Sequence, residues 1–100
     1  MNIRVDENAV KWYVKELELQ SGDTVRFFPR YSSGGGLHPG FSLGLSIEKP
    51  NHALLQTEVE GITFYIEERD GWYLDGHNLL VNYLPAHDDI EYVYERINEE

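Results

Sequence analysis

Apolar residues in the first fifth of the chain recur with the period of an α-helix. Four of them are spaced at i, i+3, i+4 and i+7, which places them on one side of a helix. Asp6 is a suitable N-cap, and Gly22 within Ser21-Gly22-Asp23 can take the left-handed conformation that ends a helix. We therefore predict a helix that runs from Asp6 towards Gly22. Its apolar positions are Val10, Tyr13, Val14 and Leu17.

From Thr24 onwards the apolar period changes to two, which is typical of β-strands with one buried face. The clearest case is Phe41–Ile47, where large apolar residues alternate with Ser42, Gly44 and Ser46. The small residues indicate that another group packs closely on that face. The predicted strands cover Thr24–Tyr31, Phe41–Ile47, 55–59, 62–66, 79–84 and 90–96.

Turn-forming residues separate these strands. Glu60-Gly61 between two alternating runs predicts a two-residue hairpin, and Pro29 marks a strand edge or bulge because proline donates no ladder hydrogen bond. Residues 67–74 fit either a loop or one helical turn, and the tail from Ile97 is expected to fray. The pattern predicts an α+β fold, with an N-terminal helix and mostly antiparallel or mixed strands in one sandwich-type domain spanning residues 1–100.

Charge narrows the class of partner. The chain has 100 residues, of which 41% are hydrophobic, and its net charge is −10. That hydrophobic share predicts a folded globule rather than a disordered acidic chain. The negative field repels phosphate backbones and anionic lipid, so we expect neither nucleic acid nor a membrane as partner. We expect a protein partner, for instance through a basic patch, and leave a homodimer open.

The chain contains no cysteine, which excludes disulfides, thiolate catalysis and sulfur ligands for a metal. The first residues lack the apolar core of a signal peptide, and no apolar run approaches the roughly 20 residues that span a bilayer. A cytoplasmic location is therefore the expectation.

Several short motifs occur in the order found in the HesB-like domain, the fold of the A-type iron–sulfur cluster carriers. They include a strand that runs into a glycine-rich loop, the alternating strand that begins at Phe41, and the segment Tyr73-Leu74-Asp75-Gly76 before a strand. The chain resembles this family from about Ile3 to Tyr94. The resemblance implies a HesB-like fold and a link to iron or iron–sulfur metabolism.

The cysteines that ligate the cluster in that family are absent here, both from the glycine-rich loop and as a Cys-Gly-Cys pair. Cluster carriage through thiolates therefore does not carry over. The favoured hypothesis is a cysteine-free, non-enzymatic HesB-like protein that acts through protein contacts as an accessory factor in iron or iron–sulfur metabolism. The sequence identifies no cofactor.

The alternative hypothesis is a metal-binding protein that uses imidazole and carboxylate ligands for iron or zinc. The candidate ligands are His38 in the glycine-rich loop, His77 and Asp75. No two histidines have a spacing that brings them together on one element. The competing interpretation is four surface histidines without a common purpose, and it is the simpler one.

The glycine-rich loop and two aromatic residues are candidates for a binding surface. Loops carry function often, and exposed Trp and Tyr are enriched at protein interfaces. A core position fits Trp72 and Tyr73 equally well. A third hypothesis, an enzyme or ligand-binding site built on the loop, has no motif in its favour. The residues of the predicted binding surface are Ser33, Gly34, Gly35, Gly36, Trp72 and Tyr73.

Overall fold

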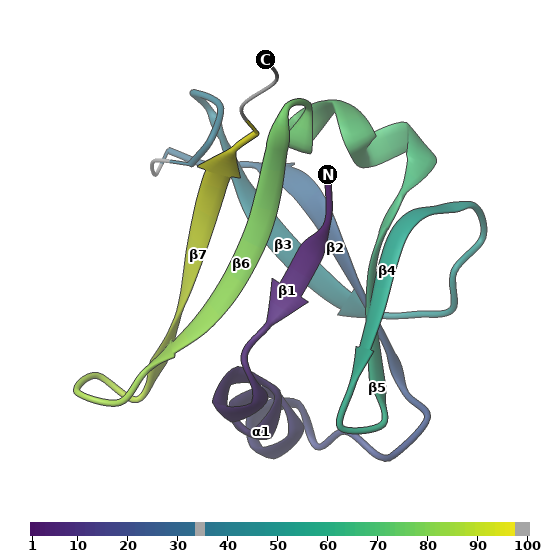
Figure 1. Ribbon diagram of the computed structural model, residues 1–100, viewed down its shortest axis with the longest axis vertical. Coiled ribbons are helices and arrows are strands. Elements are labelled where there is room, and N and C mark those ends of the chain that lie inside the picture. The colour runs from purple at the N-terminus through teal and green to yellow at the C-terminus, as the bar shows by residue number, and fades with distance from the viewer. Residues whose placement is uncertain (34–35, 98–100) are drawn as a thin grey trace.

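The described part of the chain folds into two mixed β-sheets, one α-helix and one 3-10 helix, which confirms the predicted α+β class. This computed structural model describes residues 1–33 and 36–97 (Figure 1). Gly34 and Gly35 of the predicted binding surface, and residues 98–100 of the predicted frayed tail, lie outside that description. The elements are β1 (Ile3–Val5), α1 (Glu7–Leu17), β2 (Thr24–Tyr31), β3 (Phe41–Ile47), β4 (Ala53–Val59), β5 (Ile62–Glu67), η1 (Glu68–Leu74), β6 (His77–Leu84) and β7 (Asp89–Arg96).

The smaller sheet has the order β1-β6-β7 and the larger one the order β3-β2-β5-β4. In the smaller sheet β1 runs parallel to β6, and β6 and β7 are antiparallel. In the larger sheet β2 and β5 are parallel, whereas β3 and β4 run antiparallel to their neighbours. Figure 1 shows β1 between β6 and β4, α1 at one end of the sheets, and η1 at the other.

The N-cap of α1 is Asp6, as predicted, and its carboxylate accepts a hydrogen bond from the Asn8 amide at 3.3 Å. The helix ends earlier than predicted. Glu18 takes the left-handed conformation with φ 52°, and the chain leaves the helix there rather than at Gly22. Burial explains the early exit, because Leu19 must turn back to reach the core.

One hydrophobic core lies between the inner faces of the two sheets and the buried side of α1. The alternation predicted from the sequence decides which side chains enter it. Fully buried members include Val10 and Tyr13 from α1, Val25 and Phe27 from β2, Ile62, Phe64 and Ile66 from β5, and Leu79 and Val81 from β6.

The hairpin predicted at Glu60-Gly61 joins β4 to β5. Both residues have positive φ, 55° and 79°, which matches the twist that two-residue hairpin turns require. The ambiguous segment after β5 is the helix η1, and Ile97 is tied back by a 2.9 Å bond from its amide to the Gly76 carbonyl. Neither helix in residues 1–33 and 36–97 has the length and hydrophobicity to cross a bilayer.

The outer face of the larger sheet explains two features of the sequence. Pro29 pairs with Leu43 of β3, but the pairing of β2 with β5 stops at Phe27, so β2 has only one neighbour at Pro29. Gly44 lies beneath the Phe28 ring, and a Cβ at this position would approach that ring to 2.9 Å. The group that packs on the small residues of β3 is therefore part of the neighbouring strand.

Candidate functional site

The loop before β3 is fixed to η1 through His38. The His38 Nε2 atom lies 3.1 Å from the Tyr73 carbonyl oxygen, and the imidazole ring packs 5.6 Å from the Trp72 ring. The loop closes on itself as well, because the Ser32 amide donates to the Gly40 carbonyl at 3.0 Å. His38 therefore holds two segments together that are far apart in the sequence.

Four aromatic side chains meet where β2 ends and β3 begins. The ring centroids of Tyr31 and Phe41 are 5.0 Å apart, those of Phe41 and Trp72 are 5.3 Å apart, and His38 packs against Trp72. Tyr31 is 87% exposed and Trp72 is 47% exposed. We call Tyr31, His38, Phe41 and Trp72 the aromatic surface. Large exposed aromatic groups held by neighbouring rings have the composition of a protein interface.

The predicted binding surface divides between exposed and buried residues. Ser33 and Gly36 are exposed beside the aromatic surface, and Trp72 belongs to it. Tyr73 does not, because its side chain is fully buried and its ring packs 6.0 Å from Tyr94. Gly36 also has a structural role, since a Cβ there would lie 2.9 Å from the Tyr73 hydroxyl.

The metal-binding alternative is corrected by the structure. In the part of the chain that the structure describes, no group of three His, Cys, Asp or Glu side chains is placed to hold a metal ion. The Nδ1 atom of His77 lies 2.9 Å from the Asp75 carbonyl oxygen, a local contact within one turn. The His38 ring packs against the rings of Trp72 and Tyr73.

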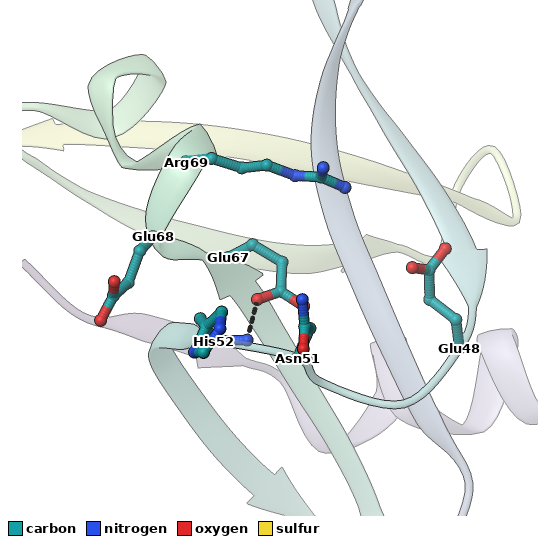
Figure 2. Close-up of a pocket in the computed structure, with 6 residues that line it drawn as sticks. All are labelled: Glu48, Asn51, His52, Glu67, Glu68 and Arg69. Atoms are coloured by element: carbon teal, nitrogen blue, oxygen red, sulfur yellow. Dashed lines mark hydrogen bonds between the residues drawn. The ribbon is translucent and has the colours of Figure 1, made fainter.

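A polar pocket lies on the other side of η1, between the β3–β4 connection and the end of β5 (Figure 2). Glu67 lies at the centre of the pocket. Its carboxylate accepts hydrogen bonds from the backbone amides of Asn51 at 2.8 Å and His52 at 2.6 Å. The Asn51 hydrogen bond is the main cause that lowers the pKa of Glu67 below its ordinary value. Lining residues are Glu48, Asn51, His52, Glu67, Glu68 and Arg69.

Arg69 extends over Glu67 in the direction of Glu48, while Glu68 points away from the pocket (Figure 2). The positive charge of Arg69 helps to lower the pKa of Glu67. Both oxygens of Glu67 are already occupied by the connection that they hold. Glu67 therefore stabilises the β3–β4 connection, and its own carboxylate oxygens are not free for acid–base chemistry.

An ion pair beneath η1 was not foreseen from the sequence. Arg26 on the outer face of β2 lies 2.6 Å from the Asp70 carboxylate and 3.3 Å from that of Glu48. Arg26 and Asp70 are 44 residues apart, and no local spacing pairs them. The alternation of β2 predicts that Arg26 lies on the face opposite the core. It does not identify Asp70 as the partner.

Comparison with known proteins identifies full-length relatives. The chain is 46% identical over 95 residues to a pyruvate dehydrogenase inhibitor of Bacillus subtilis, and this match covers 95% of the chain and all of the relative. It is 37% identical to an uncharacterised protein of Staphylococcus saprophyticus and 30% identical to one of Staphylococcus aureus, each over 92% of the chain and 97% of the relative. No family model and no solved structure matches the chain.

These findings correct the HesB-like assignment and, with it, the predicted accessory role in iron or iron–sulfur metabolism. No family model supports the assignment, and the named relative is an inhibitor of a dehydrogenase. The motif that carried the resemblance serves packing: Tyr73 and Leu74 are buried, and Gly76 makes a turn with φ 77°. In this chain those residues serve packing and a turn, so the motif by itself does not indicate ancestry.

Proposed function

The chain belongs to the family of the Bacillus subtilis pyruvate dehydrogenase inhibitor, and on this premise we propose that it inhibits a pyruvate dehydrogenase by binding to it. The observation that carries the proposal is the 46% identity over the whole length of that relative. An inhibitor of this kind is a regulatory protein with a protein partner and needs no catalytic residues of its own.

The aromatic surface is the part of the molecule that best suits such contact. Interface energy concentrates in large aromatic side chains that a partner can cover, and Trp72 and Tyr31 are the exposed members here. Neighbouring rings hold Trp72 on two sides, so little rotamer freedom remains to be lost on binding. We assign the dehydrogenase contact to this surface, with Ser33 and Gly36 at its edge.

The test is an inhibition assay with the purified chain. Pyruvate-dependent reduction of NAD⁺ by a bacterial pyruvate dehydrogenase is measured while the chain is added in increasing amounts. The expected result is saturable inhibition that follows the molar ratio of chain to enzyme and disappears when the chain is removed. An unrelated NAD-dependent dehydrogenase serves as control and should retain its full rate.

Two outcomes would contradict the proposal. One is an unchanged rate at a large molar excess of chain. The other is inhibition that persists after the chain has been removed, because a lasting change in the enzyme would indicate catalysis by the chain rather than binding.

Two expectations from the sequence also remain proposals. We propose that residues 1–100 form one domain, which the single core shared by both sheets and α1 supports. We also propose that the protein works in the cytoplasm. Sedimentation of the purified chain would separate a monomer from the homodimer that the sequence left open.

A further inference from the structure

A groove lies between β3 and β7, the edge strands of the two sheets. Among the described residues, β3 pairs with β2 alone and β7 with β6 alone, so the sheets do not close on each other here. The groove has a volume of about 460 Å³, within the range of small-molecule sites. It is lined by Arg30, Gly36, Ser42, Leu43, Tyr92 and Tyr94.

The charge of this groove is opposite to that of the molecule. The net charge of the chain is −10, yet the residues that line the groove include one arginine and no carboxylate. Arg30 forms no ion pair with a described carboxylate, and its Nε donates only a long 3.4 Å bond to the Ser42 hydroxyl. Arg30 is therefore free to meet an anion in the groove.

The Arg30 charge also acts on the wall formed by β7. Burial raises the pKa of the Tyr92 phenol, and the charge of Asp89 adds to the rise, whereas the charge of Arg30 works against it. Arg30 from β2 and Tyr92 from β7 both line the groove, on the two sides that the sheets present to it.

Two tyrosine pairs supply further donors. The hydroxyl oxygens of Tyr13 and Tyr92 are 2.7 Å apart, and those of Tyr73 and Tyr94 are 3.4 Å apart. In each pair one hydroxyl donates to the other, which leaves one proton without an acceptor among the described residues. When the buried Tyr13 and Tyr73 act as donors, the protons of Tyr92 and Tyr94 are free for a ligand, and such chains strengthen each bond.

We propose that this groove binds a small organic carboxylate. Its carboxylate group accepts from the Arg30 guanidinium and from the Tyr92 and Tyr94 phenols, and its uncharged body contacts Leu43 and the tyrosine rings. One guanidinium balances the charge of a monoanion and can bind a carboxylate through two parallel N–H···O bonds. The volume fits a free small molecule. The groove adjoins the aromatic surface at Gly36. Binding of the acid to the free chain needs no dehydrogenase, so it can be tested independently of the proposed inhibition.

The test uses the purified chain alone. Backbone amide NMR spectra are recorded during titration with acetate, pyruvate and benzoate at constant ionic strength, and with acetamide, pyruvamide and benzamide as uncharged counterparts. At least one acid should cause saturable shifts at residues 30, 42, 92 and 94, and its amide should not. Arg30→Gln should weaken that binding about tenfold, and Tyr92→Phe should weaken it severalfold.

Arg69→Gln is the matched control, because Arg69 is an exposed arginine in the other pocket. Its binding should stay within about twofold of wild type, since it lies outside the groove. The proposal is overturned if none of the acids gives a saturable shift, if an amide binds as well as its acid, or if Arg69→Gln and Arg30→Gln weaken binding equally. Spectral dispersion shows in each case that the variant is folded.

Discussion

The Arg26 guanidinium lies 2.6 Å from the Asp70 carboxylate, with 11% and 13% of the two side chains exposed. This ion pair joins η1 to the outer face of β2, at a position where β2 still pairs with β5. Burial of this pair leaves one polar group unsatisfied. The Arg26 Nε atom is buried and has no hydrogen-bond partner among the described residues. The position of η1, and hence of Trp72, depends on this contact.

Removing the charge of Asp70 should destabilise the fold. Asp70→Asn leaves the largely buried Arg26 without its closest carboxylate, which should lower the free energy of unfolding by about 2–4 kcal/mol. Chemical denaturation followed by tryptophan fluorescence measures the change. The exposed Arg69 forms no ion pair with a described carboxylate, and Arg69→Gln should change stability by about 0.5 kcal/mol or less. Equal stability of Asp70→Asn and wild type would show that the pair does not hold η1.

Stability should fall in acid because of Glu67. The amides of Asn51 and His52 stabilise its ionised form, so its pKa in the folded protein lies below the ordinary value of 4.5. A lowered folded-state pKa contributes stability at pH values above the unfolded pKa, and this contribution is lost as the pH falls through the folded one.

Glu67→Gln tests this linkage, because glutamine keeps the shape and loses the charge. The variant should unfold at lower denaturant than wild type at pH 7, and the difference should shrink steadily as the pH is lowered below 4.5. Denaturation midpoints at several pH values provide the measurement. A difference that stays constant over that range would mean that the carboxylate charge plays no part.

Stability should also fall in strong base. Burial is the main cause that raises the pKa of the Tyr13 and Tyr94 phenols far above the ordinary value of 10.0. A raised folded-state pKa favours the folded state below the unfolded pKa, and the advantage is lost as the pH rises above it. The part of the tyrosinate absorbance that belongs to these buried phenols should therefore appear together with the loss of the native circular dichroism, in one cooperative step. Ionisation of all seven tyrosines while the circular dichroism stays native would contradict the burial of these two.

The aromatic surface should carry the proposed contact with the dehydrogenase. Trp72→Ala and Tyr31→Ala each remove an exposed ring and should raise the concentration for half-inhibition at least tenfold. Ile47→Ala is the control, because Ile47 is 53% exposed at the opposite end of β3. Unchanged inhibition by both ring variants would place the contact elsewhere, even if the chain itself inhibits.

Except for β1 and η1, the elements could be predicted from the sequence to within a few residues. Alternation defined β3, and Glu60-Gly61 defined the turn between β4 and β5, because both depend on neighbours in the chain. The helix end was misplaced at Gly22, since the packing of Leu19 outweighed the preference of glycine for the left-handed conformation. Prediction from local sequence was therefore wrong where packing against the core determined the backbone conformation.

The sequence alone determined the fold class, the acidic charge and the absence of thiolate chemistry, because these follow from residue types and their local order. It could not separate Trp72 from Tyr73, which are adjacent and aromatic. Only the tertiary structure did so: a 3-10 turn directs Tyr73 into the core and Trp72 towards Phe41 and solvent. The same is true of Arg26 with Asp70 and of Arg30 with Tyr92, because strand register and helix packing bring together side chains that sequence distance keeps apart.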